Sequence, residues 1–126
     1  MSCLFDSLSY FLKIPSIEIR HIICDYLENN GQLMEDIDTT LLLSFESKKY
    51  IKKMRNPNTW GGAIEIKTAS NIWNLKIKVK NLRQKENKKT TIKFIPLKGV
   101  NSDTKKIKIT WNGYHYEPIV EKKTIL

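Results

Sequence analysis

Apolar residues in the first part of the chain recur at helical spacing. Between residues 4 and 12 they fall on one face of a helix, and Pro15 ends that run. Ser16, a residue type that caps helices well, precedes a second stretch with the same spacing. Gly31 suits the end of that stretch, because glycine accepts the left-handed backbone conformation common there. The pattern therefore predicts two helices before residue 31.

Further helices are predicted downstream. A third helical stretch, broken once, covers about residues 38–55, and Asn56-Pro57-Asn58 is typical of a turn. Thr59 is expected to cap a fourth helix that begins at Trp60, although the two glycines after Trp60 lower its helix propensity. These segments make up a helical half over about residues 3–70.

The second half of the chain has a different period. Apolar residues alternate with lysine or threonine over residues 75–79, 91–94 and 106–111. A period of two is typical of strands that are buried on one face. The polar segment 83–89 is expected to be an exposed loop. The pattern predicts a strand half over about residues 73–121.

The most specific local signal is Asn112-Gly113 between two alternating segments. This pair favours a two-residue type I′ turn between antiparallel strands. Such a turn pairs Trp111 with Tyr114 and directs His115 and Glu117 to the face opposite Trp111. The residues predicted on the core face are Ile109, Trp111, Tyr114 and Tyr116.

Helices followed by strands predict an α+β fold. The chain has 126 residues, which suits one domain, so we expect a single domain over residues 1–126. Hydrophobic residues make up 40 % of the chain, which excludes a disordered protein.

The net charge is +9, and 19 of the 22 basic residues are lysines. Such a charge can attract nucleic acid or an anionic membrane. Lysine lacks the planar fork with which arginine binds phosphates and bases, and the lysines are spread over many segments. We therefore interpret most of them as solvated surface charge.

The chain has two cysteines, Cys3 and Cys24, too few for a disulfide scaffold. Its two histidines, His21 and His115, lie far apart and no Cys-x-x-Cys occurs, so no metal site is expected. We see no membrane-spanning stretch and no signal peptide. An intracellular, reducing compartment is the expected location.

Cys3 is the first candidate for chemistry. It directly precedes an apolar helical stretch, with Ser2 as the expected N-cap. The positive end of a helix dipole lowers a thiol pKa and favours the reactive thiolate. An ordinary buried cysteine or a frayed terminal residue explains the same position. Cys24 is interpreted as packing.

His115 is the second candidate. It lies beside a tight turn, and Glu117 projects to the same side, where a carboxylate can hold the imidazole in one tautomer. The alternative is a surface histidine with Glu117 paired to Lys108 across the strands. Such an exposed pair contributes about 0–1 kcal/mol and does not preclude the catalytic arrangement.

Several segments together resemble one family. Cys3-Leu4-Phe5 is similar to the nucleophile motif of ovarian-tumour (OTU) cysteine proteases, and residues 19–27 to the helix that follows it. Residues 50–54 and the Trp60-Gly61-Gly62 segment resemble the central block, and residues 107–120 the closing hairpin with its His-Tyr pair. The segments occur in the family's order. The resemblance implies a papain-like α+β OTU fold, with a small antiparallel-containing sheet flanked by helices.

The resemblance also implies a function. An OTU protease is a deubiquitinase that cuts isopeptide or peptide bonds after the C-terminal glycine of ubiquitin. By position, Cys3 is the nucleophile, His115 its general base and Glu117 the third member. The residues carried over to the substrate side are Trp60, Gly61, Gly62 and Tyr116.

The expected partners are ubiquitin or polyubiquitin chains, with ubiquitin-like modifiers as an alternative. No cofactor, metal, nucleic acid or membrane is expected, and the chain is expected to be monomeric and cytoplasmic. The Lys-, Ile- and Asn-rich composition is typical of an AT-rich genome, including viral ones, in which case the location is the host cytoplasm.

Two departures from the family pattern leave alternatives open. The family usually carries an Asp three residues before the cysteine, a position that falls before Met1, and Asp or Asn where this chain has Glu117. Asn112 is a rival for the third position. A catalytically impaired, ubiquitin-binding OTU-like module is therefore the alternative function. A nucleic-acid-binding domain is a third hypothesis, and the core-side position of Trp111 counts against it.

Overall fold

The structure is a computed structural model, which describes residues 2–83 and 90–120. Over these residues the chain forms helices first and strands afterwards, as the α+β prediction requires. The helices are α1 (Cys3–Leu12), α2 (Ser16–Glu28), α3 (Thr39–Ser44), α4 (Tyr50–Met54) and α5 (Ala63–Trp73). The strands are β1 (Leu75–Asn81), β2 (Thr91–Phe94), β3 (Lys105–Trp111) and β4 (Tyr116–Pro118).

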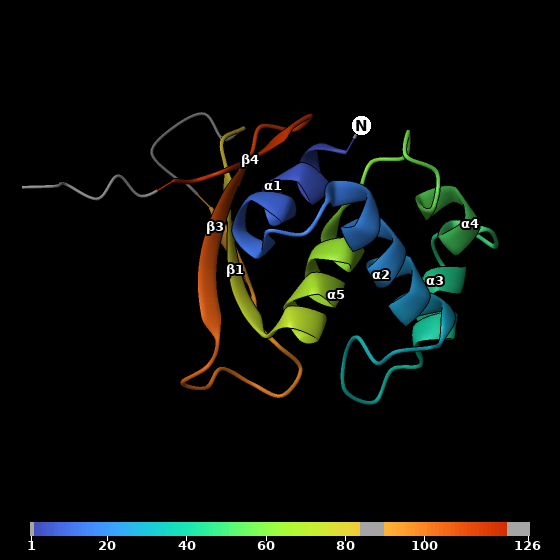
Figure 1. The fold of residues 1–126 in the computed structure, drawn as a ribbon. Coiled ribbons are helices and arrows are strands. Elements are labelled where there is room, and N and C mark those ends of the chain that lie inside the picture. Colours follow the sequence, from blue (N-terminus) through green and yellow to red (C-terminus); the bar gives the residue numbers. More distant parts are fainter. Residues whose placement is uncertain (1, 84–89, 121–126) are drawn as a thin grey trace, which may run out of the picture.

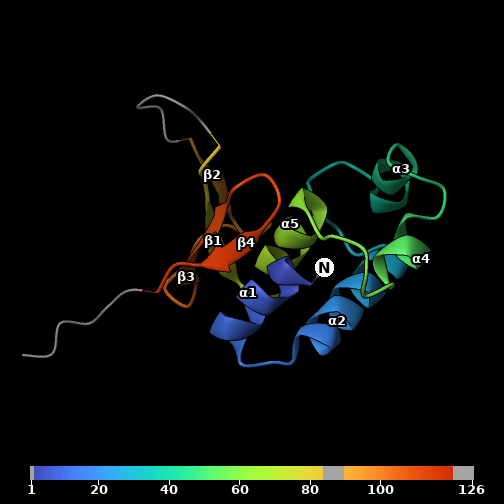
Figure 2. The ribbon, with the colours of Figure 1, turned by 90° about the horizontal axis from the view of Figure 1, so that it is seen from above.

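The four strands form a mixed sheet in the order β2-β1-β3-β4. The central pair, β1 and β3, is parallel, and the two outer pairs are antiparallel. All the helices lie on one side of the sheet, with α1 and α5 nearest to it and α2 behind them, while α3 and α4 lie farthest out (Figure 1). Seen from above, α1 lies beside β4 (Figure 2). No helix of residues 2–83 or 90–120 lies on the other face of the sheet.

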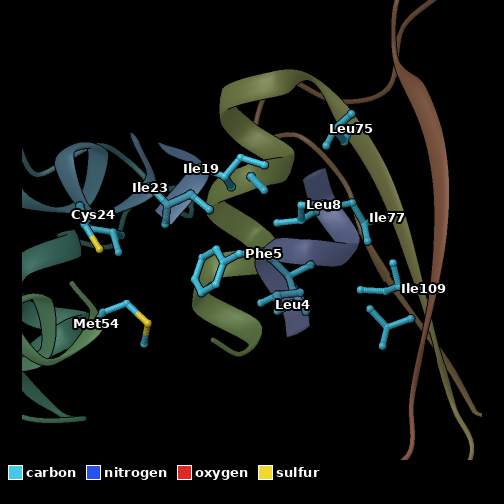
Figure 3. Packing of buried hydrophobic residues seen from close by; sticks show 14 of the residues in the cluster. Leu4, Phe5, Leu8, Ile19, Ile23, Cys24, Met54, Leu75, Ile77 and Ile109 are labelled. Atoms are coloured by element: carbon cyan, nitrogen blue, oxygen red, sulfur yellow. The ribbon is translucent and has the colours of Figure 1, made fainter. Parts of the chain in front are cut away.

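The core lies between the sheet and α2. The side chains of Leu4, Phe5 and Leu8 are buried in α1, and those of Ile77 and Ile109 are buried in the sheet (Figure 3). Burial of an aliphatic or aromatic side chain of this size contributes about 1.5–3 kcal/mol. The first turn of α1 is therefore anchored from within the core.

The first two helices end close to the predicted positions, but their caps differ. Helix α2 ends at Glu28, and Asn30, at φ 55°, takes the left-handed conformation that was expected of Gly31. Lys13, in the left-handed conformation at φ 60°, closes α1 through its N–H to the Ser9 carbonyl. Pro15, and not Ser16, is the N-cap of α2. Ser16 is already helical, and its hydroxyl donates to the Asp6 carboxylate of α1. The hydroxyl joins two helices because Asp6 competes with the backbone for it.

The predicted break in residues 38–55 is present between α3 and α4. The expected start of the next helix at Trp60 was wrong, because α5 begins at Ala63. Gly62 is its N-cap, and the Glu65 carboxylate accepts the Gly62 N–H at 2.7 Å. The Thr59 hydroxyl donates to the carbonyl of Lys53 at the end of α4 and does not cap α5. The start of α5 is therefore set by the Glu65 carboxylate and not, as expected, by Thr59.

The closing hairpin has a longer loop than predicted. Trp111 pairs with Tyr116, not with Tyr114, and four residues separate the strands. The Asn112 side-chain oxygen accepts the N–H groups of both Tyr114 and His115, which holds the wider loop. Tyr114 is 73 % exposed and is not on the core face. The register moved by two residues, so Trp111 and Tyr116 keep the common face that was predicted.

The predicted exposed loop 83–89 lies largely outside the described residues, since only Arg83 is described, and it is exposed. Helices end at Trp73 and strands start at Leu75, close to the predicted change at about residues 70–73. Asn74, left-handed at φ 53°, makes that change in one residue. Among the described residues no helix is long and apolar enough to cross a bilayer.

Candidate active site

Cys3 is the first residue of α1, and its thiol is free and partly buried. Ser2 is the N-cap, as predicted, but its hydroxyl donates to Asp6 at 3.2 Å and does not cap the first turn. The Ser2 carbonyl accepts the Asp6 N–H at 2.7 Å, which starts the helix. The first N–H groups of a helix have no partner within it. In α1 these N–H groups lie at the end where Cys3 lies, and that end is also the positive end of the helix dipole.

His115 is the candidate general base. It belongs to the hairpin loop directly before β4 and not to a strand, as the predicted register had it. Its Nε2 is 3.4 Å from Glu117 Oε1, and the two side chains are 50 % and 67 % exposed. Glu117 lies opposite Thr110 in the sheet, and not opposite Lys108 as the alternative required. The structure therefore pairs the histidine with the predicted carboxylate.

The fold brings the segments that carry Cys3 and His115 together. Helix α1, which begins at Cys3, packs against β4, which directly follows His115. Tyr116, the first residue of β4, is half-buried, and its pKa is raised first by burial and then by the charge of the Cys3 thiolate. Tyr116 therefore lies on the strand that packs against the helix starting at Cys3. Its ring also lies 6.4 Å from the Trp111 ring.

The Trp60-Gly61-Gly62 segment runs past the first turn of α1. A Cβ atom on Gly61 would be 2.8 Å from Leu4 Cδ2 and 3.0 Å from Phe5 Cε2. Gly61 therefore lets the segment approach the turn that carries the nucleophile. Gly62 and the half-exposed Trp60 instead line a hollow of about 350 Å³ between α4 and α5.

The sequence analysis missed a buried arginine. Arg20 is 1 % exposed and donates to the carbonyls of Met54, at 2.8 Å, and Pro57, at 3.2 Å. Its guanidinium lies 4.1 Å from the centre of the Phe5 ring. Burial lowers the pKa of Arg20, and the nearby Cys24 and acidic groups oppose that shift. Arg20 thus ties residues 54–57 to α1.

The spacing of α2 carries a signal for this role. Arg20 is four residues before Cys24 and seven before Leu27, and all three are buried. An arginine at i of an i, i+4, i+7 apolar stripe is directed into the core and must find acceptors there.

A buried carboxylate forms the second missed feature. Glu65 is fully buried and accepts the Tyr50 hydroxyl at 2.6 Å besides the Gly62 N–H. Burial raises the pKa of Glu65, against the effect of these hydrogen bonds. The pKa of Tyr50 is raised by burial and by the charge of Glu65. The pair joins α4 to the start of α5 and so supports the Trp60-Gly61-Gly62 segment.

Cys24, the other cysteine, is buried in the core. Burial raises the pKa of the Cys24 thiol to about 11, which keeps it protonated and unreactive, as the packing interpretation expects. Over residues 2–83 and 90–120 no group of three or more His, Cys, Asp or Glu side chains has the arrangement of a metal site.

The family model described as OTU-like cysteine protease matches residues 2–117. The chain belongs to this family. The match covers both Cys3 and His115, and it confirms the resemblance seen in the sequence motifs.

Curated relatives are similar along most of the chain. The ubiquitin thioesterase OTU1 of Xenopus laevis is 24 % identical over 124 residues, which cover 94 % of this chain and 37 % of the relative. The putative ubiquitin thioesterase otu1 of Schizosaccharomyces pombe is 33 % identical over 76 residues, or 60 % of this chain and 22 % of the relative. The chain thus spans about a third of the length of the first of these OTU relatives.

Solved OTU structures share the fold. An OTU domain in complex with ubiquitin has a TM-score of 0.66 at 26 % identity and covers 93 % of this chain and 62 % of that one. A ubiquitin-bound OTU deubiquitinase from Wolbachia pipientis has a TM-score of 0.68 at 16 % identity, with 95 % and 90 % covered. The viral OTU protease of Dera Ghazi Khan virus has a TM-score of 0.66 at 24 % identity, with 93 % and 72 % covered. The predicted papain-like α+β OTU fold is confirmed.

Proposed function

We propose that this OTU-family chain is a thiol-dependent deubiquitinase that hydrolyses isopeptide or peptide bonds after the C-terminal glycine of ubiquitin. One observation carries the proposal: the helix that starts at Cys3 packs against the strand that follows His115. The OTU relatives named as ubiquitin thioesterases and the OTU domain solved with ubiquitin support the substrate.

In the proposed reaction His115 takes the proton of the Cys3 thiol, and the thiolate attacks the carbonyl carbon of the terminal glycine. The C–N bond breaks when His115 returns that proton to the leaving lysine amine. The resulting thioester is hydrolysed by water, whose proton passes to His115 and then to the departing thiol. The cycle restores both residues and needs no cofactor or metal.

The negative oxygen of each tetrahedral intermediate needs hydrogen-bond donors. The backbone N–H of Cys3 is placed for this at the start of α1, where the Ser2 side chain makes no competing cap. Glu117, through its contact with Nε2, stabilises the protonated His115 and fixes its orientation. Asn112 acts on the loop backbone instead and is the weaker candidate for third member.

The substrate side of the proposal rests on shape. The extended C-terminal tail of ubiquitin would pass between the Trp60-Gly61-Gly62 segment and Tyr116. Gly61 lies against the first turn of α1, and Tyr116 is a half-buried aromatic on β4, the strand that packs against α1. Trp60 and Gly62 line the separate hollow between α4 and α5.

The proposal includes a place of action. A thiolate nucleophile stays active only while it is reduced, so we place the chain in the cytoplasm, as a monomer that acts on ubiquitin or polyubiquitin chains.

The test is covalent labelling by ubiquitin whose C-terminus carries a propargyl electrophile. We expect labelling of the unmodified chain, none in Cys3→Ala, and a fall of about 10³-fold or more in His115→Gln. Cys24→Ala is the matched control, because it removes the other thiol and should leave labelling intact. Labelling that depended on Cys24, or no labelling and no cleavage of any ubiquitin chain, would contradict the proposal. Ubiquitin binding without turnover, unchanged in Cys3→Ala, would select the ubiquitin-binding module instead.

A further inference from the structure

The face of the sheet opposite the described helices carries a grid of lysines. Alternate residues of the strands point away from the helices, and six of these outward positions are lysine. They are Lys76, Lys78 and Lys80 of β1, Lys93 of β2, and Lys106 and Lys108 of β3. The sequence analysis interpreted the lysines as dispersed surface charge. Pairing of the three strands instead gathers these six into one surface, which we call the lysine face.

The register places like charges directly opposite one another. Lys78 pairs with Lys93 on one side and with Lys108 on the other, and Lys76 pairs with Lys106. Like charges at directly opposed positions destabilise a sheet. The pKa of Lys78 is lowered, first by Lys76 and then by Lys93, which shows the positive potential of the face. These opposed pairs are unfavourable for folding, and an anionic partner would relieve their repulsion.

The other side chains on the lysine face indicate which kind of anionic partner it can bind. On the described strands the remaining outward residues are Thr91, Thr110 and Glu117. The one acid of this set, Glu117, lies at the end of the sheet that carries His115. None of these three is aromatic or aliphatic, so the described strands offer no outward ring on which bases stack and no outward apolar side chain to insert into a bilayer. The apolar residue that borders the lysines is Ile119, which follows β4.

The surface between the lysines is hollowed. A depression of about 640 Å³ is lined by four of the lysines, by Thr91 and by Ile119 at its rim. From strand geometry the lysine face measures roughly 10 Å across three strands and 13 Å along β1. A patch of this size spans the minor groove of a nucleic-acid duplex, about 6 Å wide in B-DNA, and reaches phosphates on both of its sides.

We propose that the lysine face binds double-stranded nucleic acid through its sugar–phosphate backbone, without reading the bases. Lysine supplies point charges that suit phosphates, and the face lacks the arginine forks that read base edges. The objection raised by the core-side position of Trp111 applies to single strands, because contacts to a duplex backbone need no stacking. The face is turned away from α1 (Figure 1), so this inference does not depend on the proposed protease function.

The test uses the full chain and a fluorescent 16-base-pair duplex of mixed sequence, as RNA and as DNA, titrated at 50 to 200 mM salt. The test variant combines Lys78→Gln, Lys93→Gln and Lys108→Gln. The matched control combines Lys48→Gln, Lys49→Gln and Lys52→Gln, exposed lysines near α4 whose loss changes the net charge equally. We expect the test variant to bind roughly a hundredfold more weakly at 50 mM salt, and the slope of log K against log salt to fall by about 2 to 3. The control should change affinity less than fivefold, and a scrambled duplex should bind as well as the first.

Three results would overturn the inference: no duplex binding at 50 mM salt, equal losses in both variants, or binding of phosphatidylserine vesicles that depends on the same lysines and exceeds duplex binding. A measurement on the unmodified chain guards against misfolded variants. Bound duplex should protect Lys78 from acetylation and leave Lys52 reactive. Protection of Lys52 without protection of Lys78 would also refute the inference. Labelling by the ubiquitin probe should be the same in both variants, so the two proposals fail separately.

Discussion

The two sides of the candidate active site are held by different means. Cys3 begins a helix whose next two residues, Leu4 and Phe5, are buried, and whose first turn is packed by Gly61 and, through Phe5, by Arg20. His115 is half-exposed in a loop, and its backbone is fixed by Asn112, three residues away. The nucleophile side depends on contacts from distant parts of the chain, while the base side depends on local hydrogen bonds.

This difference separates stability from activity. Changes around Cys3 disturb the core and should lower the free energy of unfolding together with labelling. Changes around His115 touch groups that water can also satisfy, so they should reduce labelling and leave stability nearly unchanged.

The largest effect is expected for Arg20→Ala. It leaves the carbonyls of Met54 and Pro57 without their buried donor and opens a cavity beside Phe5. The free energy of unfolding should fall by about 3–5 kcal/mol. Urea denaturation measures it, with Arg55→Ala as control. Arg55 makes exposed ion pairs with Asp25 and Glu28, which contribute about 1 kcal/mol or less. Equal losses in the two variants would show that Arg20 does not anchor the nucleophile side.

The next effect concerns the Tyr50–Glu65 pair and depends on pH. Because burial raises the pKa of Glu65 above its ordinary 4.5, folding takes up a proton between 4.5 and the raised value, and stability falls as pH rises through that window. Tyr50→Phe removes a donor to the ionised carboxylate, at a cost of about 1–3 kcal/mol when Glu65 is charged. The loss should be larger at pH 8 than at pH 4. Denaturation of both proteins across this range measures it, and a loss independent of pH would argue against a buried charge.

The two adjacent glycines give a sharper comparison. Gly61→Ala places a methyl group 2.8 Å from Leu4 Cδ2, so it should cost about 1–3 kcal/mol and slow labelling at Cys3. Gly62→Ala meets no atom within 4 Å at an ordinary extended φ, and should change stability by less than about 1 kcal/mol, because the lower chain entropy of alanine is opposed by its weaker preference for the N-cap position. Thermal unfolding and probe labelling of both variants decide this. A harmless Gly61→Ala would mean that the segment does not press on α1.

The smallest effect on stability belongs to the base side. Asn112→Ala removes the acceptor for two exposed N–H groups, including that of His115, and should cost less than about 1 kcal/mol. Labelling should nevertheless slow by roughly tenfold or more, because the histidine loses its orientation. Asn112→Asp keeps the acceptor and should restore most of the rate. Full activity in Asn112→Ala would mean that Glu117 alone orients the base.

Local patterns predicted much of this architecture. The spacing of apolar residues placed α1 and α2, and the alternation with lysine placed β1 and β3. The errors arose where two local signals competed. Thr59 lost the helix start to Glu65, whose carboxylate reaches the Gly62 N–H. The loop at Asn112-Gly113 is wider than a two-residue turn. The Asn112 side chain accepts the N–H groups of Tyr114 and His115, and these bonds hold the wider loop.

The candidate site divides in the same way. Cys3, His115 and Glu117 were found from sequence because their chemistry and their resemblance to a family motif are local. Arg20 and Glu65 were missed, because their importance lies in acceptors and donors fifteen or more residues away or in burial that a single helix does not reveal.

By itself the sequence determined the periods of its helices and strands, the alternation that directs lysines to one face of each strand, and a cysteine at the start of a helix. The tertiary structure decided that β1 and β3 lie side by side in parallel, which gathers those lysines into one face. It also decided that α1 lies against β4, which brings the helix that starts at Cys3 to the strand that follows His115. The physical reason is that backbone periodicity and side-chain chemistry act over a few residues. Strand order and helix docking are set by burial of the whole core, which no single segment encodes.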